Sequence, residues 1–415
     1  MNVLVFTTLW PNAEEPNFGV FVKHRALALS QSGGVKLRVV APVPYFPKSL
    51  AGSLLPKSWQ VKARIKEQEV IEGVTVEHPR YLVTPKVGMR FYGDWMARGA
   101  EAVVRELHRQ EPFDVIDAHY IYPDAYAALQ LGRRLDLPVV MTARGSDINQ
   151  FTQLPYIRPL IQRALGDADG IIAVSEGLKR EMIALGISAD KIKVIRNGVN
   201  RDIFHLKDQA SARRLLGLDA QRRIIITVSR LIQGKGLDRL IQAMAVLARR
   251  SLAADALLYI IGAGPERATL EKMIAEYGLQ DRVFLTGSRL QSELPDWYAA
   301  ADLFCLATHR EGCPNVVIEA LACGLPVIAT DTPGVDELIT DSANGLLVPV
   351  TNSPAESFAD KIAVALGREW HRRAIASSGG ARDWQDVAQE VKDTLSAVIA
   401  RHHQRPAKKV CPDHQ

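Results

Sequence analysis

Short apolar, β-branched segments alternate with helical patterns along the chain, and the alternation runs through two successive halves. The predicted strands of the first half begin at Asn2, Lys36, Phe113, Pro138, Gly170 and Lys191. Those of the second half begin at Arg223, Ala256, Arg282, Asp302, Pro326 and Gly345. Each segment ends in Gly, Pro or a small polar residue, which is typical of βαβ units and a parallel sheet. The sequence therefore predicts an α/β protein with two Rossmann-like, doubly wound domains.

The length of 415 residues exceeds what one hydrophobic core usually serves, so two domains are expected. We predict a first domain over 1–198, a linker over 199–222, a second domain over 223–380, a terminal helix over 381–403 and a disordered tail over 404–415. Doubly wound sheets bind ligands at the carboxyl ends of their strands, so we expect the ligand in a cleft between the domains.

Charge and composition exclude several functions. The net charge of +5 comes without any block of like charge suited to a duplex, which argues against nucleic-acid binding. Four cysteines lack C-x-x-C pairing, so neither a zinc site nor a disulfide framework is indicated, and a reducing cytoplasm is expected. The sequence also shows neither a signal-peptide pattern nor an apolar run of about 18 residues. Basic and aromatic residues from Leu55 and from Pro85 suit peripheral contact with the anionic inner face of the plasma membrane, or a solvated surface.

The segment EGCPNVVIEALACGLPVIAT combines two carboxylates with the start of an apolar helix. Pro314 suits the first helical position, which leaves Glu311 in the preceding loop and Glu319 in the second turn. Unpaired N–H groups near Asn315 and Val316, with the helix dipole, favour an anion. Two carboxylates beside an anion site repel an anionic ligand unless they contact its uncharged parts. A ligand with phosphate and several hydroxyls is therefore indicated, and a sugar nucleotide has both.

Two further segments of the second half follow strands. VSRLIQGKGLDRLI places Arg230 and Lys235 on a turn before a helix, where two cations suit a diphosphate without a metal; the alternative is a solvated basic turn. IIGAGPERATLEK contains Gly262 and Gly264 but carries Arg267 where the dinucleotide fingerprint requires a third glycine. A nicotinamide enzyme is thus disfavoured, and these glycines permit close approach of a nucleotide or form a turn.

In the first half, His119 and Tyr120 follow a predicted strand and are expected to face the cleft. Arg144 and Asp147 end the neighbouring strand and are expected to reach the same place. Gly19, before a helix, would let a sugar phosphate approach the backbone, or is simply a loop glycine. The D-x-D of GDADG precedes a strand, so its carboxylates fall at the wrong end of the sheet for a metal site in the cleft.

Taken together, these motifs resemble those of the family 4 glycosyltransferases, which have the GT-B architecture and retain anomeric configuration. The resemblance spans nearly the whole chain and rests on the order of Gly19, His119, Arg230 with Lys235, and Glu311 with Glu319. Departures are Arg144, where many relatives carry histidine, and TPGVDE, which replaces a double-glycine turn.

The resemblance implies a role for each residue. Arg230 and Lys235 would hold the donor diphosphate, Glu319 the ribose, and Glu311 the hydroxyls and developing charge of the transferred sugar, which His119 would contact from the other domain. The implied donor site also includes Gly19, Gly262, Gly264, Cys313, Pro314, Asn315 and Val316. Further sugar or acceptor contacts would come from Tyr120, Arg144 and Asp147.

The implied activity is a retaining transfer of a hexose from a UDP- or GDP-sugar to a glycan or polyprenyl-linked acceptor in cell-surface polysaccharide biosynthesis, with no metal or other cofactor. The first domain resembles bacterial exopolysaccharide or teichuronic-type enzymes. Retention could use a covalent Glu311 intermediate or same-face attack, the family's usual interpretation. Alternatives are an inactive nucleotide-sugar binder of an assembly complex and a GT-B sugar-nucleotide epimerase.

Overall fold

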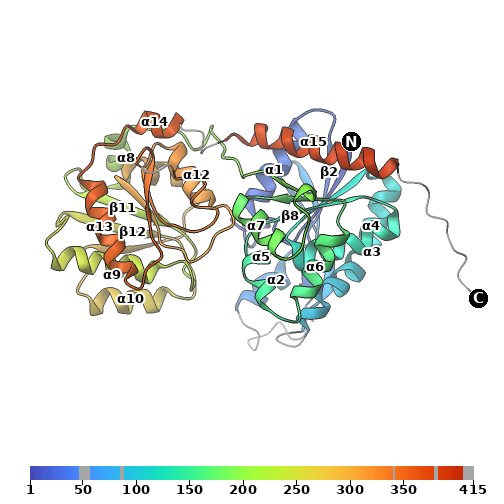
Figure 1. The fold of residues 1–415 in the computed structure, drawn as a ribbon, viewed down its shortest axis with the longest axis horizontal. Coiled ribbons are helices and arrows are strands. Elements are labelled where there is room, and N and C mark those ends of the chain that lie inside the picture. Colours follow the sequence, from blue (N-terminus) through green and yellow to red (C-terminus); the bar gives the residue numbers. More distant parts are fainter. Residues whose placement is uncertain (46–56, 85–87, 340–341, 378–381, 405–415) are drawn as a thin grey trace, which may run out of the picture. The chain divides into compact units, whose positions relative to one another are not determined.

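The computed structural model describes residues 1–45, 57–84, 88–339, 342–377 and 382–404 (Figure 1). The chain divides into two compact units. The first unit comprises Met1–Ala173, Glu181–Ile195 and the residues from Ala388 on, and the second comprises Val174–Arg180 and Arg196–Val387. The predicted tail lies outside the described residues, except for Gln404.

The first unit contains a mainly parallel sheet whose described strands run in the order β10-β9-β8-β7-β1-β2-β5-β4. Its strands are β1 (Asn2–Phe6), β2 (Lys36–Val40), β4 (Gln68–Ile71), β5 (Val74–Glu77), β7 (Val115–His119), β8 (Val139–Ala143), β9 (Gly170–Ala173) and β10 (Ile192–Val194). Every strand predicted in this half is present. Because β1 pairs with β2 on one side and β7 on the other, the strand order reverses at β1, which is where such sheets bind ligands.

Four short strands of this unit were not predicted. β4 and β5 form an antiparallel hairpin at the sheet edge, while β3 (Val43–Tyr45) and β6 (Arg80–Leu82) form a separate parallel pair. The hairpin turn is Glu72-Gly73, with φ values of 49° and 82°. Positive φ at both central residues is the geometry that matches the twist of a two-residue hairpin.

Helices surround this first sheet. They are α1 (Val20–Gln31), α2 (Lys57–Arg64), α3 (Tyr92–Gln110), α4 (Tyr126–Leu135), α5 (Ser146–Asn149), α6 (Arg158–Asp167), from Glu181 on α7 (Glu176–Ala184) and, from Ala388 on, α15 (Trp384–His403). Lys392 of α15 donates hydrogen bonds to the carbonyl oxygens of Ser32 and Gly33, at 3.0 and 2.9 Å. Val391, Leu395 and Val398 of the same helix are buried, so α15 contributes to the core of this unit.

Of the two basic and aromatic segments, residues 55–56 and 85–87 lie outside the described part of the chain. The remainder falls mainly in α2 and α3. No helix within the described ranges combines the length and apolar character needed to cross a membrane.

The second unit contains an entirely parallel sheet, in the order β13-β12-β11-β14-β15-β16. Its described strands are β11 (Arg223–Val228), β12 (Ala256–Ile261), β13 (Val283–Gly287), β14 (Leu303–Leu306), β15 (Val327–Thr330) and β16 (Gly345–Val348). All six were predicted. This is the Rossmann order, with its switch point between β11 and β14.

Helices cover both faces of this sheet. They are α8 (Gln209–Leu216), α9 (Leu237–Arg249), α10 (Arg267–Glu276), α11 (Leu294–Ala300), α12 (Asn315–Ala322), α13 (Pro354–Leu366) and α14 (Arg372–Ser377). Ile225 of β11 packs into the cluster formed with α9 and α13, whereas Ile224 and Ile226 pack into the cluster formed with α11 and α12. Alternate residues of one strand therefore support two apolar layers.

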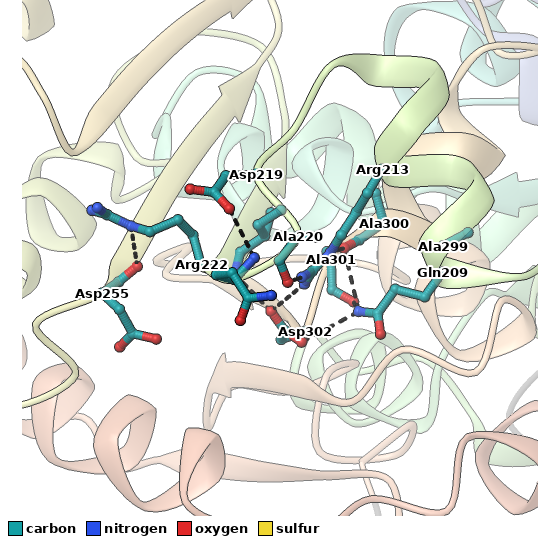
Figure 2. Close-up of polar contacts among 12 residues, drawn as sticks. Gln209, Arg213, Asp219, Ala220, Arg222, Asp255, Ala299, Ala300, Ala301 and Asp302 are labelled. Atoms are coloured by element: carbon teal, nitrogen blue, oxygen red, sulfur yellow. Dashed lines mark hydrogen bonds and ion pairs between the residues drawn. The ribbon is translucent and has the colours of Figure 1, made fainter.

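The segment 199–222, predicted as a linker, is folded against the second unit. Phe204 is 1% exposed within a hydrophobic cluster, and the segment contains α8. Figure 2 shows Arg213 of α8 donating to the Ala300 carbonyl oxygen at 2.9 Å and to Asp302 Oδ2 at 2.7 Å. Asp302 Oδ2 also accepts the backbone N–H of Ile224, which ties α8 to the start of β11. The sequence did not predict this helix because it is short and lacks a repeating apolar pattern. Its contacts with the rest of the unit are largely polar.

Candidate functional site

Three loops of the second unit meet at the carboxyl edge of its sheet. His309 N, after β14, donates to the Gly234 carbonyl oxygen after β11 at 2.9 Å, and Thr308 Oγ1 donates to the same oxygen at 3.2 Å. Leu231 N donates to the carbonyl oxygen of Ala263, after β12, at 2.9 Å. These bonds place the Arg230 and Lys235 loop, the glycine turn and the Glu311 loop around the switch point.

Lys235 and Glu311 form an ion pair, with 2.7 Å between Nζ and Oε1. Their side chains are 25% and 16% exposed, so the pair lies close to solvent and within reach of a ligand. Arg230, on the same loop as Lys235, is exposed, and its guanidinium makes no hydrogen bond or ion pair with any described residue. The structure thus brings together two of the predicted residues that are distant in sequence and presents a cation on the same loop.

Helix α12 begins beside this pair. Pro314 is the N-cap, with φ −75° and ψ 101°, not the first helical residue as predicted, because its extended ψ ends the loop and Asn315 starts the helix. The Pro314 carbonyl oxygen accepts from Val317 N at 3.0 Å, which leaves the N–H groups of Asn315 and Val316 ahead of the first intrahelical bond. Asn315 Oδ1 accepts from Asn197 Nδ2 at 2.8 Å, so a residue that the sequence analysis missed fixes the first turn.

Glu319 lies in the second turn of α12, as predicted, but its carboxyl group is buried. Oε2 accepts from the Tyr298 hydroxyl at 2.9 Å, and the Gln291 side chain supplies another hydrogen bond. Burial raises the pKa of Glu319 to about 7, although both hydrogen bonds oppose that rise. The predicted contact with a ribose therefore stays a prediction, since this carboxyl group is engaged with protein partners.

The raised pKa of Glu319 predicts a pH-dependent stability difference. The folded state holds a proton on this carboxyl between about pH 4.5 and 7, where the unfolded state does not, so its contribution to stability falls as pH rises through that window. Glu319→Gln is neutral at every pH. We expect the free energy of unfolding of the variant, relative to that of the wild type, to rise by about 2 kcal/mol from pH 5 to pH 8. Denaturant unfolding of both proteins at both pH values measures this difference.

The matched control for this measurement is Glu271→Gln, which alters an exposed carboxylate on α10 paired with Arg267 at 2.8 Å. This variant should show a much smaller change between the two pH values. If the free energy of unfolding relative to the wild type changes equally in both variants between the two pH values, the burial of Glu319 does not cause that change.

The predicted donor glycines have a structural reason of their own. A Cβ atom built on Gly262 would lie 1.8 Å from the Ser229 carbonyl oxygen, and one built on Gly264 would lie 2.3 Å from the Leu231 carbonyl oxygen. Gly262 also has φ 152°, which side chains rarely adopt. Close packing of the two loops therefore requires these glycines whether or not a nucleotide touches them.

In the first unit, His119 ends β7 within a buried charged cluster. Arg25 Nη2 lies 2.6 Å from each carboxylate oxygen of Asp117, and Arg25 Nη1 donates to Thr142 Oγ1 at 2.9 Å. Although burial alone would raise it, the Arg25 cation holds the pKa of Asp117 well below its usual range. Burial, followed by the charge of Arg25, lowers the pKa of His119 to about 3, so its imidazole is neutral.

The neutral His119 ring has a defined tautomer. Its Nε2 lies 3.4 Å from Asp117 Oδ2 and its Nδ1 lies 2.5 Å from Arg144 Nη2. Because Arg144 can only donate, Nδ1 accepts and the proton is on Nε2. His119 is 0% exposed, so the expectation that it faces the ligand directly is not met in this conformation: the neighbouring arginines enclose it.

The other predicted residues of this unit differ in environment. Asp147 is buried and accepts backbone N–H groups of Ile121 at 2.9 Å and Gly145 at 2.7 Å, so it fixes loops and is not exposed to a ligand, contrary to expectation. Tyr120 is half-buried, with φ 78° and its hydroxyl 2.7 Å from Ser146 Oγ. Such a φ is strained for a residue with a side chain, and strain of this kind gathers at functional sites.

Gly19 is buried at the N-cap of α1, with φ 66°. A Cβ atom there would lie 2.4 Å from the Leu9 carbonyl carbon and oxygen, so the loop after β1 already requires a glycine. The D-x-D residues precede β9, and Asp169 Oδ2 accepts from Val139 N at the start of β8. Among the described residues, no three His, Cys, Asp or Glu side chains gather closely enough to hold a metal ion.

Comparisons with known proteins agree with this geometry. The model described as Glycosyltransferase Family 4 matches residues 64–203, and that described as Glycosyl transferases group 1 matches residues 208–382. A protein named as a teichuronic acid biosynthesis glycosyltransferase, TuaC of Bacillus subtilis (strain 168), is 30% identical over 97% of this chain and 98% of its own length. This chain is a family 4 glycosyltransferase.

Further relatives and solved structures support the assignment. A GDP-mannose-dependent mannosyltransferase of Mycolicibacterium smegmatis is 33% identical over 59% of this glycosyltransferase and 65% of its own length. The crystal structure of Anabaena HepE in complex with UDP and glucose superimposes with a TM-score of 0.69 at 21% identity, covering 95% of this chain and 99% of that one. At that identity the structure shows the fold, so the predicted GT-B architecture is confirmed.

Sequence reasoning missed several residues that build the sites of this glycosyltransferase. Arg25 and Asp117 each interrupt an apolar pattern, and a charge within a buried pattern is a signal for an ion pair. Tyr298, which binds Glu319, left no such signal, because a tyrosine in an apolar helix is ordinarily a core residue.

Proposed function

We propose that this glycosyltransferase moves a hexose from a nucleoside-diphosphate sugar, with UDP or GDP as the nucleotide, and that it needs no metal ion. The observation that carries the proposal is the Lys235 to Glu311 ion pair at 2.7 Å, on loops that also present Arg230 and the start of α12. A departing diphosphate is stabilised by fixed cations and helix N–H groups, and the transferred sugar by a nearby carboxylate. HepE was crystallised with UDP and glucose, which favours the same ligand class here.

We infer that the reaction retains the anomeric configuration by same-face attack. The bond from the anomeric carbon to the diphosphate oxygen breaks, the acceptor oxygen bonds the same face, and a phosphate oxygen receives the acceptor's proton. Glu311 supports the positive charge that develops on the sugar ring. Its carboxylate is paired with Lys235, which makes it a weaker nucleophile and favours this route over a covalent intermediate.

The proposed acceptor is a glycan or polyprenyl-linked saccharide of a bacterial cell-surface polysaccharide. Similarity to TuaC over almost the entire chain supports this proposal. A membrane-anchored acceptor would bring this glycosyltransferase to the inner face of the plasma membrane as a peripheral protein.

The first test is a thermal-shift panel of UDP, GDP, ADP, their common sugars and NAD, each in the presence of EDTA. Ligands that bind only the folded state raise the melting temperature, and one UDP or GDP compound is expected to do so. Nuclear magnetic resonance of the glycoside formed from that donor should then show the donor's anomeric configuration. A shift with NAD alone, a strict metal requirement, an inverted product or binding without turnover would contradict the proposal.

A further inference from the structure

The carboxyl group of Glu319 is buried in a strongly apolar part of the second unit. Its neighbours in α12, Val317, Ile318, Ala320 and Leu321, are all 0% exposed, and Glu319 itself is 9% exposed. A buried carboxyl group destabilises the folded state, and an apolar residue of similar size would avoid that loss. Ionisable groups held in such surroundings are typical of functional sites, so the contacts of Glu319 indicate what its carboxyl group does.

The Tyr298 hydroxyl is a buried partner of this carboxyl group. It donates to Glu319 Oε2 at 2.9 Å, and it makes no other hydrogen bond with a described residue. Tyr298 is 0% exposed, so water does not compete for its hydroxyl. A hydroxyl that donates to a carboxylate stabilises the charged form, and this hydrogen bond keeps the pKa of Glu319 below the value that burial alone would give.

Tyr298 is itself held on several sides. Its ring contacts those of Phe204 and Phe304, with 6.0 and 5.9 Å between the ring centroids. Arg372 Nη2 donates to the Tyr298 carbonyl oxygen at 3.2 Å, which fixes the backbone near the end of α11. A ring packed on two sides leaves little freedom of rotation, so the hydroxyl is a rigid support for the carboxyl group.

The position of Glu319 in α12 places it beside the proposed diphosphate site. Glu319 follows Asn315 by four residues, so both lie on one face of the helix. Side chains on a helix lean toward its N-terminus, which brings the carboxyl group of Glu319 toward the first turn. A nucleoside-diphosphate sugar carries one ring on each side of its diphosphate. Because Glu311 is proposed to support the transferred sugar, the ribose is the ring that remains for Glu319.

We propose that Tyr298 is a positioning residue for nucleotide binding: its hydroxyl fixes the Glu319 carboxyl group so that this group accepts a hydrogen bond from a ribose hydroxyl. The inference rests on the proposed function and deepens it, because it names a residue that touches no ligand and still determines how tightly the ribose is bound. Tyr298 is fully buried, so it acts through Glu319.

The physical effect of this support is preorganisation. A glutamate side chain loses rotamer freedom when it binds a ligand, and that loss weakens binding. In this protein the hydrogen bond from Tyr298 has already fixed the carboxyl group before the nucleotide arrives. Without the hydroxyl, Glu319 would have to be ordered by the ligand and would be a weaker acceptor, since its charged form would lose a hydrogen bond.

The test titrates the full-length protein with UDP, GDP and the 2′-deoxy and 3′-deoxy forms of each, by isothermal titration calorimetry. Tyr298→Phe removes the hydroxyl and keeps the ring that packs against Phe204 and Phe304. The control is Tyr259→Phe. Tyr259 lies on β12 of the same unit, is partly buried and stacks on Phe284, and its hydroxyl makes no hydrogen bond with a described residue.

We expect the wild type and the control to bind one ribonucleotide roughly 10-fold or more tightly than at least one of its deoxy forms, which lacks a hydrogen bond to a charged group. Tyr298→Phe should bind that ribonucleotide roughly 3- to 10-fold more weakly and bind the deoxy form almost unchanged. A purely structural residue would weaken the binding of both ligands by the same factor. The ratio of the two dissociation constants therefore identifies a positioning role.

Glu319→Ala supplies a second comparison. Adding Tyr298→Phe to Glu319→Ala should not change ribonucleotide affinity further, because a positioning residue acts only through its partner. Thermal melting shows that each variant is folded. Equal binding of ribonucleotide and deoxynucleotides by the wild type, an equal loss for both ligands in Tyr298→Phe, or a further loss in the double variant would overturn the inference. Those outcomes leave the proposed function in place, whereas a wild type that binds none of these nucleotides overturns the proposed function and the inference with it.

Discussion

Replacing Lys235 with alanine should lower turnover about 100-fold or more, by analogy with the loss of one preorganised charge-stabilising donor. Lys235 is positioned by its 2.7 Å pair with Glu311, on the loop that also presents Arg230. The variant removes a cation proposed to stabilise the departing diphosphate, and it removes the ammonium group that pairs with Glu311. Lys235→Met should behave similarly, because it keeps much of the aliphatic stem and removes the charge. The measurement is single-turnover kinetics with the donor that gives a thermal shift.

Lys272→Ala is the control for the loss of a lysine from an ion pair. Lys272 pairs with Glu276 at 3.6 Å within exposed α10 of the same unit. Its removal should leave turnover unchanged. Near-normal turnover of both Lys235 variants would show that Lys235 has no part in the mechanism. If a Lys235 variant loses turnover and also melts at a much lower temperature, the lost turnover is due to unfolding.

Replacing Arg25 with methionine should destabilise the first unit by about 3–5 kcal/mol, the range for breaking one side of a buried ion pair. Arg25 and Asp117 side chains are 3% and 2% exposed, with 2.6 Å between their charged atoms. The variant leaves the Asp117 carboxylate buried without the cation that pairs with it. Hydrogen exchange of β7 amides, followed by mass spectrometry, reports the loss in this unit specifically.

Two comparisons separate charge from packing in that experiment. Arg25→Met combined with Asp117→Leu removes both charges and should recover much of the lost protection. Arg109→Met removes an exposed arginine that pairs with Glu106 at 2.7 Å, and it should leave β7 exchange unchanged. If the β7 amides exchange as slowly in Arg25→Met as in Arg109→Met, the buried ion pair does not stabilise the unit.

The parallel sheets were predictable because their central strands are buried on both faces. Such strands consist of continuous apolar segments, as in β9 and β14, whose residues are all buried. The edge hairpin of β4 and β5 escaped prediction because it is short and half-exposed. The helix α8 escaped because the contacts of Arg213 and Asp302, far apart in sequence, hold it.

The proximity of Lys235 and Glu311 was partly predictable from the sequence. The burial of the candidate site residues was not. Strand ends share one edge of a parallel sheet, so Lys235 and Glu311 were expected near each other. The burial of His119 and Glu319 depends on Arg25 and Tyr298, whose approach follows from tertiary packing. The position of a residue relative to the end of a strand predicts the edge of the sheet at which the residue lies. Whether a ligand can reach that residue depends on the side chains packed around it.

The glycine turn after β12 limits what evolution and mutagenesis can reveal about this protein. A Cβ atom added to Gly262 or Gly264 would clash with the carbonyl oxygen of Ser229 or Leu231, at 1.8 and 2.3 Å. A deep mutational scan would therefore score both positions as intolerant even in a lineage that had lost its substrate. If a related sequence keeps these glycines, that shows only that its turn still folds in the same way. If it keeps the exposed Arg230, that indicates that its catalytic activity is retained.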